Sequence, residues 1–82
     1  MKKPKITIRE LCDGEFRAYV GRCQVEFVRS FGDRKRLKPR LTIVGSSWLY
    51  ESEARAFAAE LQTAIKIMQQ GWAWLDAQRK KK

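Results

Sequence analysis

Residues 52–78, SEARAFAAELQTAIKIMQQGWAWLDAQ, decide the fold, because they form the one long segment of the chain with helical periodicity. Apolar side chains recur there at steps of three and four residues, which places them along one side of a helix. Ser52 is the expected N-cap, and Glu51 and Glu53 beside it suit the positive end of the helix dipole. The apolar stripe comprises Ala54, Phe57, Ala58, Leu61, Ala64, Ile65, Met68, Trp72 and Leu75.

The sequence before this helix predicts short strands that pack on it. Apolar and polar side chains alternate over residues 5–11, 15–20, 23–31 and 41–44, with turn residues between these segments. We therefore expect an α+β fold, in which an antiparallel meander of three to four strands packs on one long C-terminal helix. Residues 1–82 form a single domain in this interpretation, and residues 1–4 and 79–82 are flexible basic ends.

The turns predict the strand registers. A two-residue turn at Gly21-Arg22 places Arg17 opposite Glu26 on the outer face of the sheet. For the first hairpin, a two-residue Asp13-Gly14 turn would put Arg9 on the apolar face, so we expect a three-residue turn at residues 12–14. This turn sets Arg9 across from Arg17. The predicted inner-face pairs are Ile6–Val20, Ile8–Ala18, Phe16–Phe27, Ala18–Val25 and Val20–Cys23.

The end of the helix allows two interpretations. A continuous helix would be about 40 Å long at 1.5 Å per residue, against about 15–20 Å for the width of the sheet. Its last turns would then overhang the sheet, and Ile67, Trp72 and Trp74 would form an interface with a second copy or another protein. Alternatively, Gly71 breaks the helix and the tryptophans fold back on to the core.

Composition restricts the function. The chain has 18 Lys and Arg against nine Asp and Glu, a formal net charge of +9, with two cysteines and no histidine. This composition favours a polyanionic partner and offers no metal site, cofactor site or catalytic motif, so we expect a protein that is not an enzyme. The apolar runs fall short of the roughly 20 residues that span a bilayer. We expect a cytoplasmic protein with neither a membrane partner nor a small-molecule substrate.

Two basic surfaces are candidates for binding nucleic acid, with DNA favoured over RNA. The first is the outer face of the sheet, where Arg9, Arg17 and Tyr19 can reach phosphates or bases. The second is a mobile loop over residues 32–40, which carries Arg34, Lys35, Arg36, Lys38 and Arg40. Two alternatives remain open: the first surface is a solvated face in which Arg17 pairs with Glu26, and the loop merely makes the protein soluble. A protein-interaction module or homodimer built on the C-terminal helix is the alternative function.

The order of elements, with the sequence YESEARAFAAEL at residues 50–61, resembles a known group of domains. These are the small three-stranded, one-helix DNA-binding domains of tyrosine-recombinase arm-binding segments and plant ethylene-response factors. The resemblance covers about residues 5–62 and implies major-groove binding through the sheet, with Arg9, Arg17 and Tyr19 in matching positions. The chain departs from it by a strand at 41–44, a longer basic loop and a longer helix. The order is also similar to the transcriptional-coactivator type of single-strand-binding domain, which dimerises. The helix residues that carry the resemblance to the three-stranded, one-helix domains are Glu51, Glu53, Ala54, Ala56 and Phe57.

Overall fold

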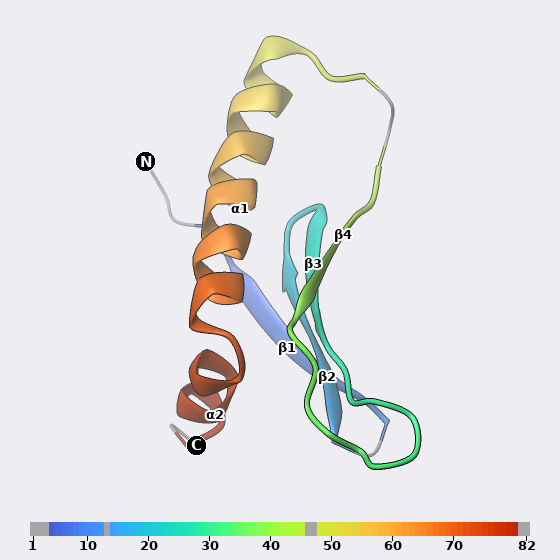
Figure 1. The fold of residues 1–82 in the computed structure, drawn as a ribbon. Coiled ribbons are helices and arrows are strands. Elements are labelled where there is room, and N and C mark those ends of the chain that lie inside the picture. Colours follow the sequence, from blue (N-terminus) through green and yellow to red (C-terminus); the bar gives the residue numbers. More distant parts are fainter. Residues whose placement is uncertain (1–3, 13, 46–47, 81–82) are drawn as a thin grey trace.

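The computed structural model of the protein describes residues 4–12, 14–45 and 48–80. Four antiparallel strands, β1 (Ile6–Cys12), β2 (Glu15–Val20), β3 (Cys23–Phe27) and β4 (Arg40–Ile43), form one sheet in the order β1-β2-β3-β4. Helices α1 (Glu51–Gln70) and α2 (Trp72–Lys80) follow and lie on one face of this sheet (Figure 1). The predicted α+β meander with a C-terminal helical layer is confirmed.

The strand registers agree with those that the turn residues predict. Arg9 pairs with Arg17 between β1 and β2, and Arg17 pairs with Glu26 between β2 and β3. The first turn differs in detail, because Cys12 pairs with Glu15 and the register shifts between Glu10 and Cys12. Such a bulge absorbs one extra residue without reversing the faces of the strand beyond it. Asp13, which was assigned to this turn, lies outside the described residues.

The segment between β3 and β4 folds as a hairpin with backbone hydrogen bonds of its own, where the sequence predicts a mobile loop. The strand expected to reach Phe31 ends at Phe27, and β4 begins at Arg40. Between them the backbone continues an irregular ladder, with N–H to oxygen distances of 2.7 Å from Ser30 to Lys35 and 3.0 Å from Leu37 to Val28. These bonds satisfy backbone groups that a free loop would leave to water. We call residues 28–39 the basic hairpin.

The helix begins two residues earlier than an N-cap at Ser52 predicts, so the assignment of Ser52 as N-cap is wrong. Tyr50 occupies the N-cap position, with extended backbone angles, and Glu51 is the first helical residue. The backbone N–H of Tyr50 donates to the carboxylate of Glu53 at 3.2 Å. A carboxylate at the third helical position bonds in this way to the residue before the helix, which fixes the start at Glu51.

The C-terminal helical part is two helices, because α1 ends at Gln70 and Gly71 separates it from α2. Gly71 has φ 63° and ψ −146°, which a residue with a side chain rarely adopts, and its N–H still donates to the carbonyl oxygen of Ile67 at 2.8 Å. The second of the two interpretations of the helix end is therefore confirmed. The overhang lies at the opposite end, where the first turns of α1 extend past the sheet (Figure 1).

The core lies between the sheet and the helices. The side of α1 that it buries differs from the predicted apolar stripe. Ile67, which is not part of the predicted stripe, is 2% exposed, whereas Ile65, which is part of it, is 42% exposed. The two side chains lie about 200° apart around a helix, so only one of them faces the sheet. The buried residues of the core are Phe16, Ala18, Val20, Cys23, Val25, Phe27, Ala64, Ile67 and Leu75.

A polar contact fixes α1 against the turn between β2 and β3. The carboxylate of Glu60 accepts the backbone N–H of Arg22 at 3.1 Å. Gly21 lies against this carboxylate, with φ 58°, and a Cβ there would be 2.0 Å from the nearest Glu60 atom. The turn thus needs glycine both for its backbone angle and for the close approach of the helix. This contact sets the helix on the inner face and leaves the outer face uncovered.

Candidate nucleic-acid interface

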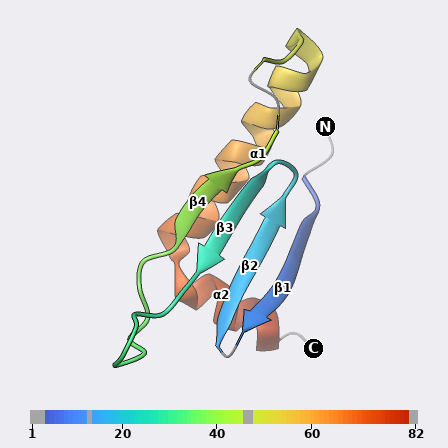
Figure 2. The same cartoon turned by 90° about the vertical axis from the view of Figure 1, so that its right-hand side faces the viewer.

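The outer face of the sheet carries a row of charged side chains that crosses all four strands. Arg9 lies opposite Arg17, Arg17 opposite Glu26, and Glu26 opposite Arg40. In Figure 2 the sheet lies in front of both helices, so its outer face points to the viewer. The row brings three guanidinium groups together with one carboxylate, and it follows from strand alternation, which turns every second side chain outward.

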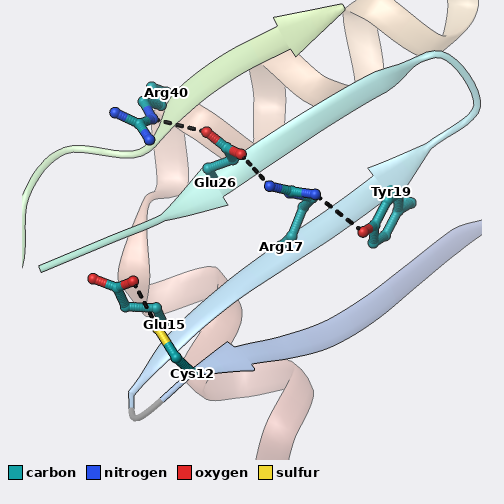
Figure 3. A network of polar contacts seen from close by, with 6 residues as sticks. All are labelled: Cys12, Glu15, Arg17, Tyr19, Glu26 and Arg40. Atoms are coloured by element: carbon teal, nitrogen blue, oxygen red, sulfur yellow. Dashed lines mark hydrogen bonds and ion pairs between the residues drawn. The ribbon is translucent and has the colours of Figure 1, made fainter. Parts of the chain in front are cut away.

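Glu26 holds two of these arginines in place. Its carboxylate accepts a hydrogen bond from Arg17 Nη2 at 2.6 Å and another from Arg40 Nε at 2.8 Å (Figure 3). Glu26 is 8% exposed, so the pair with Arg17 is shielded from solvent. The hydrogen bond from Arg40, followed by that from Arg17, holds the pKa of the Glu26 carboxyl below its ordinary value despite burial.

The arginines of the row differ in their access to a ligand. The side chain of Arg40 is 67% exposed, that of Arg17 only 29%, and Arg9 lies exposed on the edge strand. Arg17 also donates from Nη1 to the hydroxyl of Tyr19 at 3.3 Å. Arg17 therefore positions Glu26 and Tyr19, while Arg9 and Arg40 present charge on either side. The predicted pairing of Arg17 with Glu26 is confirmed as a contact.

A second row on the same face is polar and uncharged. Thr7 lies opposite Tyr19, Tyr19 opposite Gln24, and Gln24 opposite Thr42. Hydroxyl and amide groups of this kind donate and accept hydrogen bonds, and an aromatic ring among them offers a stacking surface. The outer face thus combines cationic groups with neutral hydrogen-bonding groups and one tyrosine.

Arg36 of the basic hairpin turns towards the helices, although its side chain remains 41% exposed. Its guanidinium donates to the two carboxylate oxygens of Asp76 at 3.0 and 3.3 Å, and it lies 4.4 Å from the centre of the Trp72 ring. These contacts fasten the hairpin to α2. Arg36, which was predicted to bind nucleic acid, has a structural role in this geometry.

The remaining predicted hairpin residues are exposed. Arg34, Lys35 and Lys38 lie on the surface of the hairpin, whose distal part curves away from both helices towards the side of the outer sheet face (Figure 1). At the base of the hairpin, the backbone N–H of Arg29 donates to Glu15 at 3.0 Å. The distal part of the hairpin thus lies towards the side of the outer sheet face, whereas Lys38 borders a hollow with Met68 and Trp72 of the helical layer.

The predicted interface residues of the C-terminal helix pack within the chain. Ile67 belongs to the core, and its 2% exposure leaves no surface for a partner. Trp72 makes an edge contact with Phe27 at a centroid distance of 5.4 Å, and Trp74 stacks on the same ring at 6.2 Å. The apolar surface that a partner would need is therefore largely used by the fold.

Sequence reasoning missed two features of this surface. Arg40 was assigned to a loop, although the alternation in Arg40-Leu41-Thr42-Ile43 is itself a strand signal that places Arg40 beside Glu26. Phe31, assigned to a strand, lies on the basic hairpin and is fully exposed. No alternation pattern distinguishes a phenylalanine at the end of a strand from one displayed on a turn.

The described residues hold no cluster of three or more His, Cys, Asp or Glu side chains that could bind a metal ion. Within the same part of the chain, neither helix has an apolar stretch of the length that crosses a membrane. Comparison of the chain with protein-family models, with curated proteins and with solved structures found no match.

Proposed function

We propose that this chain is a small nucleic-acid-binding accessory protein, which uses the outer face of its sheet together with the basic hairpin. The observation that carries the proposal is the row Arg9, Arg17, Glu26 and Arg40, in which two arginines face each other directly. Like charges directly opposite each other destabilise a sheet, and a bound phosphate would relieve that repulsion.

In this proposal the residues have different roles. Arg9 and Arg40 contact phosphates, because they are the more exposed arginines of the row. Arg17 is a positioning residue that holds Tyr19 and Glu26, and Tyr19 contacts the backbone or a base. Lys35 extends the cationic surface along the distal part of the hairpin. Such contacts bind nucleic acid without reading its sequence, since phosphates are the same at every position.

The test is the binding of labelled single-stranded and duplex DNA, measured by fluorescence anisotropy over a range of salt concentrations. Each phosphate contact contributes roughly 0.7 to 0.9 to the slope of log affinity against log salt. The double variant Arg9→Ala/Arg40→Ala is expected to reduce the slope by about 1.4 to 1.8 and to weaken binding.

The matched control is Arg55→Ala/Lys66→Ala, which removes the same charge from exposed positions on α1. It is expected to bind much as the unchanged protein does. Failure of the unchanged protein to bind either DNA at near-physiological salt would contradict the proposal. Equal weakening by the two double variants would also contradict it, since it would assign binding to net charge rather than to the sheet face.

A further inference from the structure

Phe31 is a fully exposed aromatic residue on an ordered turn. The backbone N–H of its neighbour Ser30 donates to Lys35 at 2.7 Å, and the carboxylate of Asp33 accepts from the Lys35 N–H at 3.0 Å and bonds the Ser30 hydroxyl. These contacts close the turn from both sides. Phe31 is therefore held outward by a defined backbone rather than by a flexible tail.

The fold makes no use of this ring. Phe16 and Phe27 are 6% and 0% exposed in the core, whereas the exposure of Phe31 reaches the full value for the residue. A phenylalanine left in water forgoes the stabilisation that burial of its apolar surface would give. A ring displayed in this way is available to an apolar or aromatic group of a ligand.

The surroundings of Phe31 specify the kind of ligand. Arg34 and Lys35 are exposed on the same turn, and the distal part of the hairpin curves to the side of the sheet that carries the arginine row (Figure 1). A ring beside cationic side chains is the arrangement in which a base stacks on the aromatic group while the charges follow its phosphates.

We propose that Phe31 stacks on an unpaired base of a single-stranded segment that lies across the outer sheet face. This inference rests on the proposed function and adds the substrate class to it. An unpaired base stacks on an exposed ring without first leaving a base pair, whereas a side chain inserted into a duplex must first unstack a base step, which is unfavourable. Arg17 already bonds Glu26 and Tyr19, which leaves Arg9 and Arg40 of the row as the phosphate contacts that would have to offset that unstacking.

The test uses a short oligothymidine that contains one fluorescent adenine analogue, and a duplex of the same sequence. Phe31→Ala is expected to weaken single-strand binding about 5- to 100-fold, to abolish the stacking-dependent fluorescence change and to leave the salt slope unaltered. Duplex affinity is expected to stay the same. Phe31→Trp restores single-strand binding, and Trp48→Ala, which removes another exposed aromatic ring, leaves it unchanged.

The outcomes separate this inference from the proposed function. If Phe31→Ala binds single strands as the unchanged protein does, while Arg9→Ala/Arg40→Ala binds them weakly, the stacking inference is overturned and the proposed function stands. Equal losses on single strand and duplex would overturn it in favour of a duplex wedge. Absence of any binding by the unchanged protein would overturn both.

Discussion

Trp72 donates its indole N–H to the carbonyl oxygen of Leu37 at 2.7 Å, across 35 positions of the sequence. The bond joins α2 to the basic hairpin, and the guanidinium of Arg36 covers the same ring at 4.4 Å. The hairpin is thus fixed to the helical layer on one side. Its remaining basic residues lie on a segment that is packed against the helical layer, which favours a defined binding surface over a loose cationic arm.

Replacing Trp72 by phenylalanine tests this attachment. Phe keeps an aromatic ring beside Phe27 but lacks the N–H, so the free energy of unfolding is expected to fall by about 1 to 2 kcal/mol in urea denaturation. The amides of Ser30 and Leu37, which bond within the hairpin, are expected to exchange faster with solvent. Trp48→Phe is the control, because that ring is 66% exposed. Equal effects of the two substitutions would contradict the attachment.

Glu26 makes stability depend on pH in the acid range. The pKa of its carboxyl is lowered in the folded protein from an ordinary 4.5, so its stabilisation is present above pH 4.5 and is lost as the pH falls through the folded value. Near neutral pH, the free energy of unfolding of Glu26→Gln is expected to be about 1.5 to 3 kcal/mol lower than that of the unchanged protein.

The difference between Glu26→Gln and the unchanged protein is expected to shrink as the pH falls from 4.5 through the lower pKa of Glu26 in the folded protein, because both proteins lack a charged carboxylate below it. Denaturation curves at a series of pH values measure this difference in the free energy of unfolding. Glu15 and Asp33 also have lowered pKa values, but they are common to both proteins and cancel in the difference. A difference that stays constant down to strongly acid pH would contradict this role of Glu26.

Arg9→Thr is expected to separate stability from binding. It removes the like charge opposite Arg17 and introduces a good strand former, so the free energy of unfolding is expected to rise by about 0.2 to 1 kcal/mol. The gain is expected to shrink at high salt, which screens the repulsion. DNA affinity is expected to fall at the same time. A variant that loses stability, or gains it equally at all salt concentrations, would show that the pair is not repulsive.

Gly71→Ala is expected to destabilise the protein by more than about 1 kcal/mol, because alanine rarely adopts a positive φ. The space around the position is not the obstacle, since a Cβ would lie 3.9 Å from the nearest atom, the carbonyl oxygen of Met68. Gln70→Ala, next to it on the exposed end of α1, is expected to change stability by less than about 0.5 kcal/mol. Thermal unfolding followed by circular dichroism compares the two variants. Similar results for both would mean that the break at Gly71 is not required.

Much of the sheet could be predicted from the sequence, because strand alternation and short turns leave few registers. Arg17 opposite Glu26 follows from the two-residue turn at Gly21, and Arg9 opposite Arg17 follows from the apolar partners of Ile8. The end of the helix was less predictable. A glycine within a helical pattern permits both a weak continuous helix and a break, and the packing of Trp72 and Trp74 on Phe27 decides between them.

The candidate site was predictable only in part. The residue types on the outer face follow from alternation, but the exposure of each depends on neighbours that come together through folding. Arg36 has the charge of a phosphate contact, and only the position of Asp76 on α2 shows that it is engaged elsewhere. Phe31 is the converse case, an apolar residue that folding leaves in solvent.

Titration of the labelled protein with short single-stranded DNA, followed through its backbone amide resonances, tests the central claim most directly. The account predicts shifts on the outer face and the basic hairpin, at Thr7, Arg9, Tyr19, Phe31, Lys35 and Arg40, with α1 unaffected. An absence of shifts at near-physiological salt, or shifts confined to the helical face, would contradict it.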